Sequence, residues 1–283
     1  MCGLLETFGV YRCRHDSDEV GFDRASDLVR EQKHVSIKIL SAYASGLAES
    51  NRLAEIDICR ALQYESTACP LDPGLSYVVR PLDIFTFDGP AGKHFCIVTE
   101  PFGCSLSALF DSMESRQLPL KRIMKWLKDT LLGLCFLHDK CHLVHSGEGI
   151  PAPKEPVLMA LCTDLKAQNF LMKIRDSDQV INSELITQPA YIYDIPKTIS
   201  FLEFGYCPVK SLPLPLTISG DKRGMLFESV ITDFGHSHFD DRHLSSIVQP
   251  AALRAPEVAL RLSWDKAIDI WSLGCLVSIF VII

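Results

Sequence analysis

The sequence lacks the features that assign a chain to several simple classes. Positive charge is not in excess, since 28 Lys and Arg residues stand against 35 Asp and Glu residues in 283, a formal net charge of −7. Proteins that hold nucleic acid mainly through phosphate contacts have the opposite balance. A composition with 47% hydrophobic and 22% charged residues also excludes a disordered, collagen-like or coiled-coil chain. We therefore expect a globular protein that does not bind nucleic acid directly.

Paired cysteines and long apolar runs are also missing. The 11 cysteines form no C-x-x-C pair, and scattered cysteines of odd number are typical of reduced, packed thiols in an intracellular protein. The N-terminus meets charged residues early and has no long apolar stretch of the kind found in secretory signals. The uncharged stretch from Ile270 to Ile283 has 14 residues. A membrane span needs roughly 18 to 20, so we predict a buried core helix here and no membrane association.

The apolar pattern predicts a β-rich front and a helical back. Alternating or β-branched runs predict strands at 34–40, 77–79, 84–87 and 95–99, and helical spacing predicts a helix over 53–62. After Pro101, helical spacing predicts an apolar stripe along one long helix, made of Ile123, Leu127, Leu131, Leu134 and Cys135. Residues 1–30 carry no clear pattern. The fold class we expect is α+β, with two lobes that meet near residues 100–103.

Three groups of residues have side chains suited to phosphate chemistry. Lys38 lies on the first predicted strand and Glu55 on the helix that follows, so the carboxylate could fix the ammonium group against phosphate oxygens. The run Thr163–Asn169 spaces Asp164, Lys166 and Asn169 as a proton acceptor, a cation and an oxygen ligand for Mg²⁺. Each pattern alone is more often an ordinary surface feature than a site.

The third group follows a strand. Asp233 begins an Asp-Phe-Gly triplet directly after the apolar residues Val230 and Ile231, where its carboxylate can bind a hard cation. An Ala-Pro-Glu triplet ends at Glu257, and an Ile-Asp-Ile-Trp run around Asp269 opens the terminal apolar stretch. Chance explains any one of these motifs, but not all of them in this order.

Taken together, the motifs resemble the signature of the eukaryotic protein kinases. Thr163 before Asp164, the spacer of more than sixty residues between Asn169 and Asp233, and the run Ile247–Glu257 are similar to the SR-protein kinases, in the divergent form found in filamentous fungi. The resemblance implies a two-lobed protein-kinase-like fold, with a β-rich small lobe and a helical large lobe. It also implies ATP and Mg²⁺ as cofactors.

The resemblance assigns roles residue by residue. Lys38, paired with Glu55, would contact the ATP phosphates, Thr99 would be the gatekeeper, and Glu100 to Phe102 would form the adenine hinge. Asp164 would be the catalytic base and Lys166 would touch the γ-phosphate, while Asn169 and Asp233 would hold Mg²⁺. Structural roles fall to His145, Phe234, Gly235, Glu257 and Asp269; among these, Asp269 would anchor the catalytic loop and Glu257 would brace the segment after the activation loop.

The sequence departs from the family in three places. No G-x-G-x-x-G motif precedes Lys38, so residues 1–30 form a divergent N-terminal segment without a recognisable glycine-rich loop. Residues 146–162 interrupt the family's continuous His-Thr-Asp motif, either as retained intron sequence or a gene-model error, or as a real insertion. The family's last helices would lie beyond Ile283, so we expect a kinase domain that is shortened at both ends.

These boundaries give the expected organisation and function. Residues 31–103 would form the small lobe and hinge, and residues 104–283 the large lobe, which contains the insert and a spacer over 176–227. We expect a monomeric serine/threonine kinase of cytoplasm and nucleus that acts on Arg/Ser-rich, splicing-factor-like proteins. The alternative is a catalytically impaired kinase remnant or pseudokinase that serves as a binding module. A small-molecule phosphotransferase is disfavoured because the Ala-Pro-Glu and Ile-Asp-Ile-Trp motifs build a platform for protein substrates.

Overall fold

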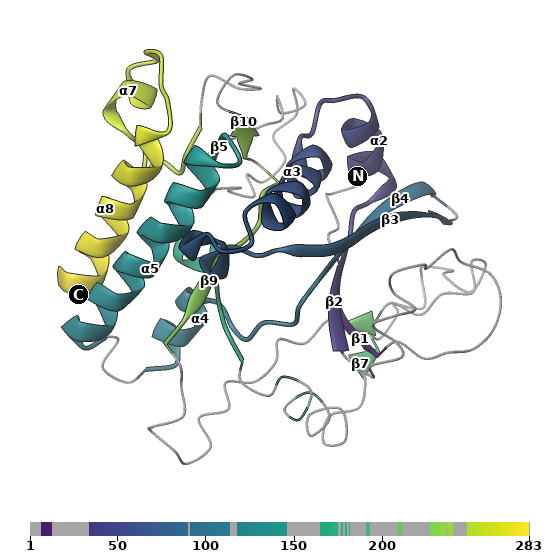
Figure 1. The fold of residues 1–283 in the computed structure, drawn as a ribbon, viewed down its shortest axis with the longest axis horizontal. Helices are drawn as coiled ribbons and strands as arrows, with labels where there is room; N and C mark the ends of the chain where they lie inside the picture. Colours follow the sequence, from purple (N-terminus) through teal and green to yellow (C-terminus); the bar gives the residue numbers. More distant parts are fainter. Residues whose placement is uncertain are drawn as a thin grey trace, which may run out of the picture.

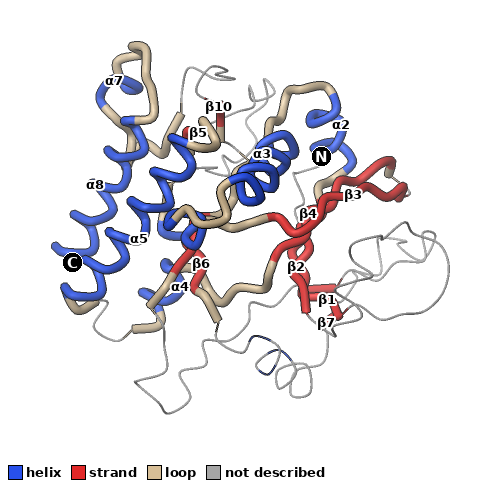
Figure 2. The backbone as a smooth tube through the Cα atoms, viewed as in Figure 1, coloured by secondary structure: helices blue, strands red, loops and turns tan. Residues whose placement is uncertain are grey.

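The structure is a computed structural model. It describes residues 7–12, 34–89, 91–113, 118–145, 165–174, 191–192, 209–210, 227–235, 237–239 and 248–282, together with residues 177, 179 and 181. The four-stranded sheet lies on one side of the molecule and the two longest helices lie on the other, with short strands among them, which gives the two-lobed α+β arrangement seen in Figure 1 and Figure 2. This division agrees with the fold class expected from the sequence.

The small lobe contains a four-stranded antiparallel sheet in the order β1-β2-β4-β3. Its strands are β1 (Thr7–Arg12), β2 (His34–Ile39), β3 (Pro81–Gly89) and β4 (Gly92–Thr99). In the register of the two central strands, Lys38 of β2 lies opposite Ile97 of β4. The strands predicted at 34–40, 84–87 and 95–99 are therefore confirmed. The unpatterned segment 1–30 contributes β1, which the sequence did not reveal.

Two helices pack on this sheet, α2 (Ala42–Glu49) and α3 (Glu55–Ala68). The hydroxyl of Ser41 accepts a hydrogen bond from the Ala44 amide at 3.1 Å and so caps the start of α2. The small-lobe core consists of apolar side chains from both helices and the sheet, including Leu40, Ala44, Leu47, Leu53, Ile56, Cys59 and Ile97. The other face of α3, with Ile58 and Leu62, belongs to the core of the large lobe.

A short 3₁₀ helix, η1 (Pro73–Tyr77), connects α3 to β3 and packs tightly on the long helix α5 (Leu120–Asp139). A Cβ atom on Gly74 would lie 2.1 Å from the Leu132 carbonyl oxygen and 2.7 Å from the Phe136 Cβ. The strand predicted at 77–79 is wrong. Tyr77 ends η1, and Val78 makes only an isolated bridge with Ile231.

The large lobe is built around α5 and α8 (Ala267–Ile282), which lie side by side at the left of Figure 1. Trp126 of α5 makes edge contacts with Phe170 and Phe280, whose ring centroids lie 5.1 and 5.2 Å away. Phe280 also stacks on Phe110 of α4 (Leu106–Asp111) at 4.4 Å. These aromatic contacts fix both helices around one core.

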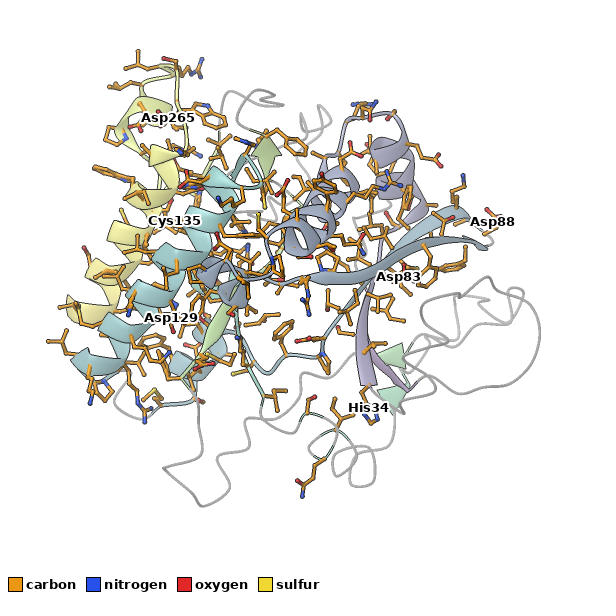
Figure 3. The ribbon with its side chains drawn as sticks, viewed as in Figure 1. His34, Asp83, Asp88, Asp129, Cys135 and Asp265 are labelled. Carbon is orange, nitrogen blue, oxygen red and sulfur yellow. The ribbon has the colours of Figure 1, made fainter. Side chains whose placement is uncertain are left out.

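Both helices are less buried than the sequence indicated. In α5 the predicted apolar stripe is only partly correct, because Leu131 and Cys135 are exposed, whereas Trp126 and Phe136, which the stripe omitted, are buried. Figure 3 labels Cys135 on this helix. The predicted core helix at the end of the chain is α8, but Ile270 and Trp271 are each 47% exposed, so only one face of it is buried.

Short elements complete the described structure. They are β5 (Leu143–Val144), η2 (Ala167–Asn169), β6 (Phe170–Met172), β7 (Tyr191–Ile192), β8 (Val209–Lys210), β9 (Ser229–Ile231), β10 (His238–Phe239) and α7 (Pro256–Ala259). β6 pairs with β9, β5 with β10, and β7 with β8, all antiparallel. No helix within the described ranges is long and apolar enough to cross a membrane. The insert 146–162 and most of the spacer 176–227 lie outside the described residues.

Candidate active site

The centre of the site is the ammonium group of Lys38. Its Nζ lies 2.6 Å from Oε1 of Glu55 and 3.2 Å from Oδ1 of Asp233. The lysine and the glutamate side chains are only 8% and 3% exposed, whereas Asp233 is 31% exposed. Because buried charges are costly unless they are paired, the sheet and α3 can approach this closely only with the ion pair formed. Burial, and next the charge of Glu55, raise the pKa of the nearby Cys59 thiol, which therefore stays protonated.

Asp233 is held by an unusual backbone conformation. Its φ of 63° lies in the left-handed region, which a non-glycine residue adopts only when its surroundings demand it. Gly235, two residues later, lies directly beside both carboxylates, since a Cβ there would lie 3.4 Å from Asp233 Oδ1 and from Glu55 Oε2. The Asp-Phe-Gly turn thereby directs the carboxylate of Asp233 toward Lys38.

The β6–β9 pairing brings Asn169 next to Asp233. The Thr232 amide donates a hydrogen bond to the Asn169 carbonyl at 2.9 Å, and the Asn169 side chain is buried. An amide and a carboxylate offer the hard oxygen ligands that Mg²⁺ prefers, and Mg²⁺ usually takes only one or two protein ligands beside waters and substrate phosphates. This fits the finding that no three His, Cys, Asp or Glu side chains gather as a metal cage within the described residues. The residues present therefore suit Mg²⁺ bound together with a phosphate ligand.

Asp269, in the first turn of α8, supports the loop that leads toward the site. Its Oδ2 accepts hydrogen bonds from the His145 amide at 2.7 Å and from Nε2 of His138 at 2.9 Å. The other side of His145 contacts the Asp-Phe-Gly segment, because its Nε2 donates to the Thr232 carbonyl at 3.0 Å and its ring meets Phe234 edge-on at 5.2 Å. One buried carboxylate thus connects α8 to α5 and, through His145, to the segment that follows β9 and contains Asp233.

Sequence reasoning missed His138. It lies in the last turn of α5 between the fully buried Leu137 and exposed Asp139, and its side chain is 8% exposed. The sequence did contain a signal for it, namely a polar residue on the apolar face of a predicted helix. Such a histidine is expected to be buried, and a buried histidine requires a hydrogen-bond partner.

The connection between the lobes runs from Thr99 to Gly103. Thr99 is half-buried at the end of β4, Glu100 is 60% exposed and forms a surface ion pair with Arg80 at 3.7 Å, and Phe102 is half-buried. The Gly103 amide then donates to the Met172 carbonyl at 2.8 Å, which joins this connection to β6. Strand β6 is therefore shared by the hinge and the Asn169 side of the site.

Three predicted site residues are placed less completely. Asp164 lies outside the described residues, as does Thr163. Lys166 is half-buried directly before η2, and its carbonyl accepts a bond from the Asn169 amide at 2.9 Å. Glu257 is half-buried in α7, and within the described part of the chain its side chain has no hydrogen-bond partner. Their predicted roles stay predictions.

Lys38, Glu55, Asn169 and Asp233 thus converge at the junction of a β-rich and a helical lobe, as the resemblance to the eukaryotic protein kinases implies. In sequence the chain is similar to the serine/threonine-protein kinase SRPK of Physarum polycephalum, with 29% identity over 255 residues, 87% of this chain and 53% of the relative. It is 27% identical to a serine/threonine protein kinase of Aspergillus fumigatus over 95% of this chain and 58% of the relative. A shorter stretch, 38% of this chain and 12% of the relative, is 32% identical to the serine/threonine-protein kinase SKY1 of Saccharomyces cerevisiae.

These relatives make the chain a divergent, SRPK-like sequence with a protein kinase fold. It spans about half the length of the curated relatives that it matches. No protein-family model matches the sequence.

Proposed function

We propose that this chain is the kinase portion of an ATP- and Mg²⁺-dependent serine/threonine protein kinase that acts on Arg/Ser-rich proteins. The observation that carries the proposal is the convergence of Lys38, Glu55 and Asp233 within 2.6 to 3.2 Å, beside the buried Asn169. A surface lysine on a strand needs no such arrangement. A phosphate-binding lysine does, because its ammonium group must be held in one position.

In this proposal the described residues of the site bind different parts of the nucleotide and its metal ion. Lys38, oriented by Glu55, neutralises phosphate oxygens, and Asn169 and Asp233 hold Mg²⁺. The metal, when bound, reduces the negative charge that develops on the transferring phosphoryl group. Thr99 is the gatekeeper, and Glu100 and Phe102 contribute the hinge that receives the adenine.

The transfer itself is assigned to the loop before η2. Asp164 accepts the proton of the substrate hydroxyl, and Lys166 stabilises charge at the γ-phosphate. The insert 146–162 enters this loop, where a displacement of an ångström can cost on the order of 10² in rate. A kinase fold that binds nucleotide or protein without transferring phosphate is for this reason the second candidate function.

Arg/Ser-rich substrates are supported by the relatives named SRPK and SKY1 and by the charge of the chain, since a formal net charge of −7 favours a basic partner. We also propose that the protein acts as a monomer in cytoplasm and nucleus, where such substrates occur.

The test combines MgATP binding with phosphate transfer to a peptide of repeated Arg-Ser dipeptides. We expect the unmodified chain to bind MgATP and to label this peptide, but not the matching Lys-Ala peptide. Asp164→Asn should abolish transfer while MgATP binding persists, and Asp233→Asn should weaken binding itself. Binding without transfer would favour the second candidate, and the absence of any MgATP binding would overturn the proposal.

A further inference from the structure

We propose that Gln249 is a positioning residue that holds the segment Pro250–Leu253, whose tip is exposed, in register with the catalytic loop through the first turn of α8. The proposal rests on the proposed kinase function, in which this segment, directly before the Ala-Pro-Glu triplet, faces the protein substrate. It gives a role to a residue of the run Ile247–Glu257, to which the sequence analysis assigned none.

Gln249 is an anomaly on two counts. It is a polar side chain with 0% exposure, and its φ of 66° lies in the left-handed region. Glutamine is mostly an exposed residue, and a non-glycine residue keeps a left-handed backbone only where its surroundings fix it. Both features indicate that the surroundings are built around this side chain.

The amide of Gln249 uses both of its ends. Its Nε2 donates to the Ile268 carbonyl at 2.6 Å and to Oγ of Ser272 at 2.8 Å, and both partners belong to α8. Its Oε1 accepts a hydrogen bond from the Ala255 amide at 2.9 Å. The side chain of Gln249, which directly precedes the segment, therefore joins α8 to Ala255, which lies two residues after the segment ends.

The segment closes on itself around this contact. Arg254 donates to the Gln249 carbonyl at 2.7 Å from one guanidinium nitrogen and to the Val248 carbonyl at 3.1 Å from another. The Leu253 amide donates to the Pro250 carbonyl at 2.9 Å, and the Leu253 carbonyl accepts from the Ser272 hydroxyl at 3.1 Å. These bonds leave Ala251 and Ala252 exposed at the tip of a loop whose base is buried.

The same turn of α8 holds the catalytic loop. Ile268 accepts from Gln249, and the next residue, Asp269, accepts from the His145 amide at 2.7 Å. Apolar packing repeats this link, because Val248 and Ala255 share a buried cluster with Val144 and Ile268. Two segments more than a hundred residues apart in the sequence are thus held by adjacent residues of one helix, which fixes their relative position.

The experiment compares Gln249→Met with Gln249→Glu. Methionine keeps the length and unbranched Cβ of glutamine but removes all three hydrogen bonds, and glutamate keeps the acceptor for Ala255 while losing the donor to Ile268. Gln63→Met is the matched control, because Gln63 lies half-buried on α3 and its side chain makes no hydrogen bond with any described residue. The readouts are KM for the Arg-Ser peptide, KM for ATP, and amide hydrogen exchange over 250–256 and over α8.

We expect Gln249→Met to raise the peptide KM about tenfold and Gln249→Glu to raise it at least as much, because the new carboxylate would be buried without a cation and against the Ile268 carbonyl. In both variants the KM for ATP should be unchanged. Exchange should accelerate over 250–256 but not over α8, and Gln63→Met should behave like the unmodified chain. An unchanged peptide KM with unchanged exchange would overturn the inference. So would a uniform change in both KM values together with faster exchange throughout, because that would mark a purely structural residue.

Failure of the proposed function gives a different result. If the unmodified chain transfers no phosphate, the kinase proposal fails on its own account, and the exchange measurement alone decides whether Gln249 holds the segment. Local acceleration over 250–256 would then support that holding role, and its absence would reject it.

Discussion

Lys38 and Glu55 form a buried ion pair of 2.6 Å between the central strand β2 and the first turn of α3. We expect Lys38→Met to lower the free energy of unfolding by about 3–5 kcal/mol, because the Glu55 carboxylate stays buried without its cation. Adding Glu55→Gln should recover part of that stability, since the amide is neutral. MgATP binding should be lost in both variants. Urea denaturation and titration calorimetry measure the two effects.

The control for this pair is Lys93→Met. Lys93 makes a 2.8 Å ion pair with Glu49, but both side chains are about half exposed, so solvent screens the interaction and stability should change little. Equal losses of stability at Lys38 and Lys93, or no recovery in the double variant, would contradict the expectation.

Gly74 is expected to be intolerant of substitution. An alanine Cβ would lie 2.1 Å from the Leu132 carbonyl oxygen, so η1 must move away from α5, at a cost of about 1–3 kcal/mol or more. Gly46→Ala is the matched change in α2, where no atom lies within 4 Å of the new Cβ. There we expect a gain of about 0.5–1 kcal/mol, since glycine is unfavourable inside a helix. Thermal unfolding of both variants checks the difference, and equal effects would argue against tight η1–α5 packing.

The described cysteines should differ sharply in reactivity toward alkylation. Burial raises the pKa of the Cys96 thiol to about 11, and burial together with nearby Glu65 raises that of Cys141 to about 12. Both stay protonated at pH 8, so they should resist iodoacetamide in the folded protein, whereas the exposed Cys135 should react. Peptide mapping by mass spectrometry before and after denaturation measures this, and rapid alkylation of Cys141 in the folded chain would contradict it.

Asp269→Asn tests the link between α8 and the catalytic loop. An asparagine oxygen can still accept a bond from the His145 amide, but it has lost the charge that strengthens both hydrogen bonds. We expect a loss of about 1–3 kcal/mol in unfolding free energy and a lower kcat, with MgATP affinity retained. Asp57→Asn, at a partly exposed position of α3 where the carboxylate only pairs with the exposed Arg60, should change stability, kcat and MgATP affinity little. Wild-type kcat and stability in Asp269→Asn would show that the link is dispensable.

The sequence predicted the sheet and the central ion pair because both depend on local pattern. Alternation identified the strands that carry Lys38 and Thr99, and the order of the motifs paired Lys38 with Glu55. It did not identify η1, since Tyr77, Val78 and Val79 are β-prone, and only the packing of Gly74 against α5 makes the chain turn there.

The long-range hydrogen bonds could not be predicted from the sequence. Gln249 is joined to α8 through residues 19 to 23 positions away, and His138 to Asp269 across 131 positions. No periodicity marks such partners. The sequence also failed to predict that Leu131 and Cys135 of α5 are exposed. An apolar side chain does not by itself reveal whether a neighbouring helix covers it.

The close contact of η1 with α5 has a mechanical consequence. Since α3 leads into η1, and since Ile58 and Leu62 pack in the large-lobe core while Ile56 and Cys59 pack in the small-lobe core, α3 is held by both lobes. A rotation of the sheet about the Thr99–Gly103 connection would therefore strain the contacts of α3 with one lobe or the other, and β2 could shift relative to α3. The Lys38–Glu55 separation is then a gauge of that rotation, and a pair of spectroscopic labels on β2 and α3 would read the angle between the lobes.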